Sequence, residues 1–315
     1  MSALADHPLL AATAPAVRRE LGCTPQDIAA ADAKLRCGPD GRSRDALDAH
    51  ARAVWNACWQ QIARRRPGRF AVAPSRLAER DPIVLAFLYA RRVHAERALP
   101  VFVASDRERA LLAASRRALN SQGFSLSPAR AFVIDGRLPV LQAVAQHERF
   151  VGLSFAQEPA LRRHVLLDGD HISDLRRRHQ HGAVAQLVLH EQLHATIGVA
   201  ARARPWTYHD PLVSAVDEAV TTVLELWAAV AAEDPRPTAA KISRRAAGNC
   251  YRRQARTVLR LLADGQPDMP LTQATWRLAM ENLRYATGRQ TAAALDRLAF
   301  TRRTPRDWLK KIGEV

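Results

Sequence analysis

The segment LVLHEQLHATIG, which runs from Leu187 to Gly198, places two imidazoles and a carboxylate among apolar residues. On a helix, His190 and His194 lie one turn apart on the same face, which is the spacing that two imidazoles need to bind one metal ion. Glu191 lies about 100° further around the helix, where it can reach a water on that ion without being a ligand. Burying these three side chains is costly unless a cation compensates them. The segment therefore predicts a zinc site; the alternative is a chance H-E-x-x-H in a core helix.

A catalytic zinc needs a third protein ligand and one position open to water. Glu218, on the next predicted helix, is the first candidate. His194 lies about 10 Å before the first helix ends and Glu218 about 12 Å into the second, so antiparallel helices bring them level. His209, in the loop WTYHDP, is the alternative ligand. His209 or Tyr208 could instead stabilise the oxyanion of a tetrahedral intermediate. The spacing favours Glu218 as the ligand.

The helix that carries Glu218 has an apolar stripe and a polar side. The polar side comprises Ser214, Glu218, Thr221, Thr222 and Glu225. A solvated helix face would have the same pattern. The polar side is therefore either exposed to water or turned toward the two histidines.

Helix start signals dominate the first hundred residues. Thr24-Pro25 and Asp81-Pro82 each place an N-cap residue before proline, and long helices are predicted over 43–66 and 81–98. Further helices are predicted over 105–121, from Gly182 to about Ala200 and from Pro211 to about Ala232. Short β-branched or aromatic runs punctuated by Asp-Gly predict strands within 99–105, 130–144, 149–155 and 163–172. The polar stretch from Gly169 to Gly182 is predicted to be a loop, although His171, His179 and His181 could line a cleft.

These elements predict a helix-rich α+β fold. A small mixed β-sheet is expected to pack on the H-E-x-x-H helix, with helical regions before and after it. Three regions follow: a helical N-terminal region (1–98), a core with the sheet and both site helices (99–234), and a basic helical region (235–315). The segment Glu233 to Thr238, EDPRPT, is the predicted linker before the last region.

Composition bounds the class of protein. The chain has 315 residues, 48% of them hydrophobic, which predicts a globular protein with a sizeable core. No run approaches the ~20 apolar residues of a membrane span, and the first residues do not have the pattern of a secretory signal. The four cysteines form no C-x-x-C pair, which favours reduced structural thiols. We expect a cytoplasmic protein, or one exported by a route that needs no signal peptide.

The charge is strongly basic, with a net charge of +16 and a pI near 11.0. From Lys241 to Val315 there are 16 basic and 6 acidic residues. Arg252, Arg256 and Arg260 follow one another at helical spacing, a pattern that can contact phosphate. This quarter of the chain could bind an anionic partner, either nucleic acid or an acidic protein, or it could be a solvated face. Aromatic residues make up only 6%, which argues against recognition of single-stranded nucleic acid.

HEQLH followed 24 residues later by DEAVTT resembles the zincin metallopeptidases, and among them the gluzincins, over about 187–225. The resemblance implies one zinc ion per chain, held by His190, His194 and Glu218, with Glu191 as the general base. It also implies a mixed sheet packed on the active-site helix. Ala200 stands where the metzincin pattern requires a histidine. Thr222 stands where gluzincins usually have an aspartate that supports a zinc-bound histidine.

The resemblance implies a hydrolase, a zinc metalloendopeptidase acting on a specific protein or peptide substrate. One of the strands between Phe150 and Ile172 would pair with the substrate backbone. One alternative is a nucleic-acid-associated basic protein, either a non-enzymatic binder or a SprT-like protease with His209 as third ligand. Another is an inactive zincin scaffold used for protein interaction.

Overall fold

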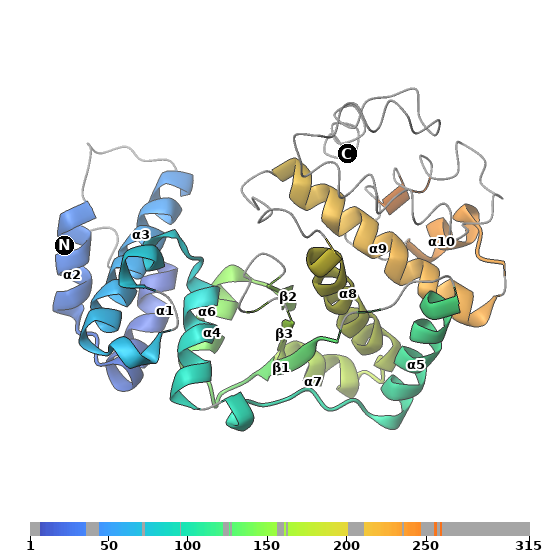
Figure 1. Cartoon of the computed structure of the whole chain (residues 1–315), viewed down its shortest axis with the longest axis horizontal. Helices are drawn as coiled ribbons and strands as arrows, with labels where there is room; N and C mark the ends of the chain where they lie inside the picture. The colour runs from blue at the N-terminus through green and yellow to red at the C-terminus, as the bar shows by residue number, and fades with distance from the viewer. Residues whose placement is uncertain are drawn as a thin grey trace. The chain divides into compact units, whose positions relative to one another are not determined.

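A computed structural model describes most of the chain before residue 247. The described residues are 7–35, 44–70, 73–94, 96–121, 126, 128–155, 161, 163–200, 211–234, 236–246, 255, 256 and 259. Across these residues the fold is helix-rich with one three-stranded mixed sheet, which confirms the predicted fold class (Figure 1). In this part of the chain no helix is long and apolar enough to cross a membrane.

The chain divides into two compact units that are discontinuous in sequence. The first unit comprises 1–102, 132–151 and 166–171, and the second comprises 103–131, 152–165 and 172–315. The units do not follow the three regions drawn from the sequence, because the segment 132–151 packs with the N-terminal helices. The division into the three regions 1–98, 99–234 and 235–315 stays a prediction.

Helices make up most of the first unit. They are α1 (Pro8–Ala16), η1 (Val17–Leu21), α2 (Pro25–Leu35), α3 (Arg44–Arg65), η2 (Pro67–Arg69), η3 (Pro74–Glu79), α4 (Pro82–Val93), η4 (Glu96–Ala98) and α6 (Pro139–Glu148). The predicted starts at Pro25 and Pro82 are confirmed. Ahead of α2, the Asp27 N–H donates to Thr24 Oγ1 and the Thr24 N–H donates to Asp27 Oδ2, a reciprocal cap.

In the described part of the second unit, helices pack on one another in pairs. α5 (Asp106–Ser121) packs on α8 (His181–Ala200) and on α9 (Pro211–Glu233), and α8 packs on α9. α10 (Ala239–Arg245) packs on α9 and follows the predicted linker. The predicted helices over 105–121, 182–200 and 211–232 are confirmed within a residue or two at each end.

The sheet has the order β1-β3-β2, with β1 at Arg130–Ile134, β2 at Gly152–Ser154 and β3 at His164–Asp168. The Arg130 N–H donates to the carbonyl of Arg163, so β1 and β3 start together and run parallel. The Asp168 N–H donates to the carbonyl of Val151, so the end of β3 meets the start of β2 and these strands are antiparallel. β2 is therefore an edge strand, and it packs on α8.

Four predictions of local structure were wrong. The helix predicted over 81–98 ends at Val93, where the His94 N–H donates to the carbonyl of Ala90. Only the first part of the run 130–144 is a strand, because Pro139 starts α6, whose buried residues Val140, Leu141, Val144 and Ala145 have helical spacing. The stretch 99–105 forms a single antiparallel bridge, between Val101 and Phe132. The predicted loop after β3 is largely helix α7 (Gly169–Arg177), which begins where Asp168 Oδ1 accepts from the Asp170 N–H.

Candidate metal centre

Two packed helices position the residues of the H-E-x-x-H segment. In α8, Val184, Val188, Leu189 and Leu193 are buried, so the apolar residues anchor the helix in the core. Every side chain of α9 from Thr221 to Ala228 is buried as well. The polar side of α9 is therefore not a solvated face at this point. Thr221 and Thr222 are each 0% exposed and Glu225 is 5% exposed.

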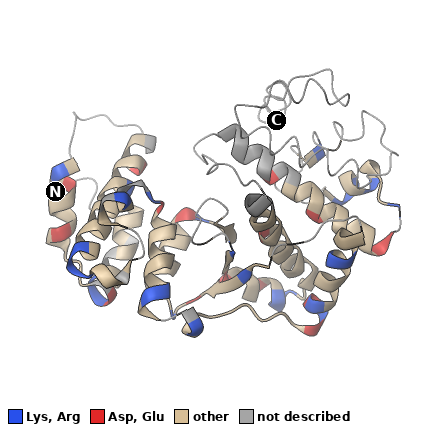
Figure 2. Ribbon diagram, viewed as in Figure 1, with Lys and Arg blue, Asp and Glu red and all other residues tan. Residues whose placement is uncertain are grey.

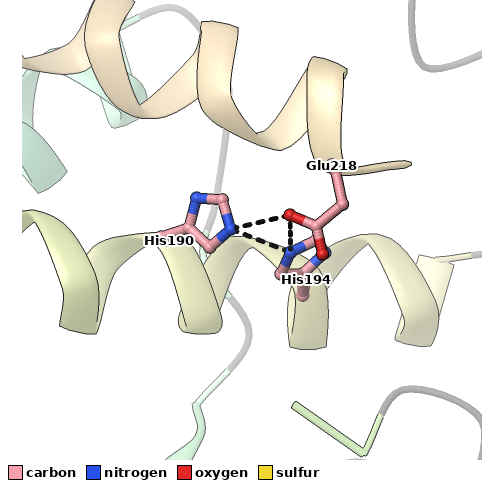
Figure 3. A group of neighbouring side chains, drawn as sticks. All are labelled: His190, His194 and Glu218. Atoms are coloured by element: carbon pink, nitrogen blue, oxygen red, sulfur yellow. Dashed lines mark hydrogen bonds and ion pairs between the residues drawn. The ribbon is translucent and has the colours of Figure 1, made fainter. Parts of the chain in front are cut away.

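His190, His194 and Glu218 meet between α8 and α9 (Figure 3). His190 Nε2 lies 3.0 Å from His194 Nε2 and 3.3 Å from Glu218 Oε2. His194 Nε2 lies 3.5 Å from the same carboxylate oxygen. Within the described part of the chain, this is the one group of His, Cys, Asp and Glu side chains that could hold a metal ion.

The distances within this trio match the edges of a tetrahedral site. Ligand atoms bonded to one ion at about 2.1 Å and at tetrahedral angles lie about 3.4 Å apart. The three observed separations, 3.0, 3.3 and 3.5 Å, lie around that value. Two imidazole nitrogens and one carboxylate oxygen are also the donor types that suit zinc. The residues present therefore fit a zinc ion.

The outer nitrogens of both histidines have partners that orient the rings. His190 Nδ1 lies 2.8 Å from Glu225 Oε2, and because a carboxylate can only accept, the Nδ1–H donates. His194 Nδ1 lies 3.3 Å from Thr221 Oγ1, and in the tautomer that leaves Nε2 free to bind a metal, the Nδ1–H donates to this hydroxyl oxygen. Both Nε2 atoms are then left to present lone pairs toward the centre of the trio.

Lone pairs that converge in this way require a cation. Burial disfavours the charged form of His190, but hydrogen bonds with Glu218 and Glu225 outweigh it and raise the pKa of His190 to about 9. Burial likewise disfavours the charged form of Glu218, and its two histidine partners hold the pKa of that carboxyl far below its ordinary value. Without a metal, a proton on His190 would supply the positive charge at neutral pH. A divalent ion can take the place of that proton.

The sequence placed Thr221 and Glu225 on the polar side of the Glu218 helix, but gave neither of them an individual role in the centre. Both follow Glu218 on one helix face, at three and seven residues, which was a usable signal. Thr222, at the position of the usual gluzincin aspartate, has no hydrogen-bond partner for its buried hydroxyl among the described residues. Glu225 therefore supports His190 in place of a residue at position 222.

Several predicted residues lie elsewhere or beyond the described ranges. Tyr208 and His209 lie outside the described residues, as do Arg252 and Arg260, while Arg256 is exposed. Glu191 is 6% exposed and lies against Gly152 of β2.

Among the described residues, His179 and His181 do not belong to the group of possible metal ligands. His179 is exposed, whereas His181 belongs to a separate cluster around Glu108 of α5. Glu108 is 0% exposed and accepts from Arg176 at 2.7 and 3.0 Å. It also accepts from the Ser105 N–H at 2.9 Å and lies 3.1 Å from His181 Nδ1.

Comparison with known proteins found no relative of this chain. No protein-family model, no curated protein and no solved structure matches the chain.

Proposed function

We propose that the protein is a zinc-dependent metallopeptidase that hydrolyses peptide bonds of a specific protein substrate. The observation that carries this proposal is the convergence of His190, His194 and Glu218 within 3.5 Å of one another, on helices of which α8 also carries the buried Glu191. The donor set and the separations suit zinc, and the order of sheet, H-E-x-x-H helix and ligand helix resembles the gluzincins.

Each side chain has a role in this proposal. His190, His194 and Glu218 would hold the ion, with Glu225 and Thr221 orienting the two rings. Zinc supplies the acidification of water and the polarisation of a substrate carbonyl. Glu191 takes the proton from the attacking water and returns it to the leaving amine. Tyr208 and His209 remain candidates to stabilise the oxyanion, and β2, as the edge strand on α8, is the candidate to pair with substrate backbone.

Replacement of the base tests the proposal. The zinc-loaded wild type and Glu191→Gln would be incubated with a peptide library, with zinc measured in both. We expect Glu191→Gln to keep its zinc and to lose cleavage by about 10²- to 10⁴-fold. Asp106→Asn, which removes a carboxylate from the surface of α5, is the control and should cleave normally.

Other outcomes identify the competing functions. A wild type that holds zinc but cleaves nothing would favour the scaffold used for protein interaction. A wild type that takes up no zinc would remove the peptidase proposal altogether.

The anionic partner is a separate proposal. Figure 2 shows Lys and Arg interspersed with Asp and Glu along the described helices, and most of the basic last quarter lies outside the described residues. Nucleic acid or an acidic protein remains the candidate for that quarter. Salt-dependent binding that is lost when Arg252, Arg256 and Arg260 are replaced together would support it. We propose that this activity belongs to the cytoplasm, with export from the cell as the alternative.

A further inference from the structure

Gly152, the first residue of the edge strand β2, lies against the H-E-x-x-H helix. Its φ lies outside the left-handed region, so backbone conformation does not require glycine here. Glycine is required here because there is no space for a side chain. A Cβ at this position would lie 2.6 Å from Glu191 Oε1, 2.8 Å from Glu191 Cγ and 2.9 Å from Leu187 Cδ1.

All three of these atoms belong to two side chains one turn apart on α8. Ordinary contacts of a Cβ are 3.4–4 Å, so a side chain at position 152 would overlap the Glu191 side chain at two atoms. Since the strand backbone is tied to β3, the movable partner is the end of the glutamate. Glu191 itself is only 6% exposed, so its carboxylate lies between the helix and the strand rather than free in solvent.

We propose that Gly152 is a positioning residue for the general base. Because Gly152 has no side chain, the Glu191 side chain packs directly against the backbone of β2. This contact sets the position of the Glu191 carboxylate. This inference rests on the proposed peptidase function, in which Glu191 moves the proton. A misplacement of about 1 Å in a catalytic group can cost about 10²-fold in rate, so a methyl group at position 152 acts on the chemistry through Glu191.

The kinetic test uses Gly152→Ala in the zinc-loaded full chain. We expect kcat to fall about 10- to 100-fold, with KM and zinc content nearly unchanged, because neither the ligands nor the strand edge is altered. Gly182→Ala, on the same helix α8 with nothing within 4 Å of the added Cβ, is the matched control and should keep full activity. An unchanged kcat in Gly152→Ala, or a rise in KM alone, would overturn the positioning role.

Leu187 provides a second control, because it is the other side chain that the new methyl would meet. We expect Leu187→Ala to leave the kcat of Gly152→Ala low, since the overlap with Glu191 persists. Recovery of kcat in this double variant would mean that Gly152 acts through strand packing, and the proposal would be wrong.

Thermal unfolding separates this inference from the proposed function. Gly152→Ala should lower Tm equally in the wild type and in Glu191→Gln, whose side chain has the same size, and lower it less in Glu191→Ala, where the space is empty. If the wild type cleaves but Gly152→Ala lowers Tm by the same amount in all three backgrounds, only the role of Gly152 is overturned. If the Tm change depends on the residue at position 191 as expected but no cleavage is found, the peptidase function and the catalytic role of Gly152 are both overturned. The contact between Gly152 and Glu191 is then still established.

Discussion

The second unit buries two clusters that combine histidine with glutamate. Around Glu108, the chain supplies its own cation, Arg176, and each carboxylate oxygen accepts hydrogen bonds from groups of the protein. Around Glu218, the described residues within hydrogen-bonding distance are two imidazoles, and the outer nitrogens of these rings already contact Glu225 and Thr221. The two clusters share residue types and differ in the source of positive charge.

This difference separates a structural cluster from a candidate metal centre. A buried carboxylate is costly unless it is paired, and Arg176 removes that cost permanently for Glu108. Among the described residues, only the two imidazoles lie within hydrogen-bonding distance of Glu218, so there the compensating charge is a proton or a metal ion. We therefore expect added metal to change the stability of the Glu218 cluster only, and the loss of Arg176 to change the stability of the Glu108 cluster only.

The largest expected effect is on zinc binding. His194→Ala and Glu218→Ala should each reduce zinc from about one per chain to none, because two of three protein ligands do not hold the ion through dialysis. The wild type should also gain about 4 kcal/mol of stability at zinc concentrations a thousandfold above Kd, and the variants should not. Mass spectrometry of the metal and thermal unfolding measure both.

Glu108→Gln is the matched control for the zinc experiment and should bind zinc as the wild type does. If Glu218→Ala kept its zinc while His194→Ala lost it, the third ligand would be His209 or another residue.

Removal of the internal cation should be the next largest effect. Arg176→Ala leaves Glu108, which is 0% exposed, without its guanidinium partner. We expect the free energy of unfolding to fall by about 3 kcal/mol, measured by urea denaturation with and without zinc. Arg177→Ala, one residue away with a side chain 74% exposed, should change stability by less than about 0.5 kcal/mol. An equal loss in both variants would contradict the role assigned to Arg176.

Acid should distinguish the clusters as well. Burial raises the pKa of Glu108, but Arg176, the Ser105 N–H and His181 outweigh it and lower the pKa to about 2. Because the folded pKa is below the unfolded value, this stabilisation is present above about pH 4.5 and is lost as the pH falls toward 2. Wild type should therefore lose about 2 kcal/mol more than Glu108→Gln between pH 5 and pH 3. Parallel pH profiles of the two proteins would refute this.

The smallest expected effect concerns the support of the rings. Glu225→Gln should weaken zinc binding about 10- to 100-fold without abolishing it, because His190 loses the charged acceptor of its Nδ1–H. Thr222→Val is the control of nearly equal shape, and competition with a chelator should give it the Kd of the wild type. A similar loss in Thr222→Val would return the supporting role to the position that the gluzincin pattern predicts.

Local sequence was sufficient to predict many helices of both units. The helical period places His190 and His194 on one face whatever surrounds them, and the proline after a capping residue predicts where α2 and α4 begin. The run from 130 to 144 shows the limit. Its β-branched residues suggested strands throughout, yet Pro139 starts a helix that packs on α1 and α4, which are distant in sequence.

The sequence by itself determined that His190, His194 and Glu218 could hold a metal, because their spacing along two helices is a local property, and it left His209 as the alternative third ligand. Only the tertiary structure decided that Glu225 and Thr221 hold the outer nitrogens, because that depends on the register between α8 and α9. The tertiary structure also decided that Arg176 neutralises Glu108 and that Gly152 lies against Glu191. Each of these contacts joins two elements that are separated in sequence, and no periodic pattern of residues along the chain relates them. The physical reason is that hydrogen bonds and steric overlap act over about 3 Å, whereas the packing that brings these atoms together is set by the whole core.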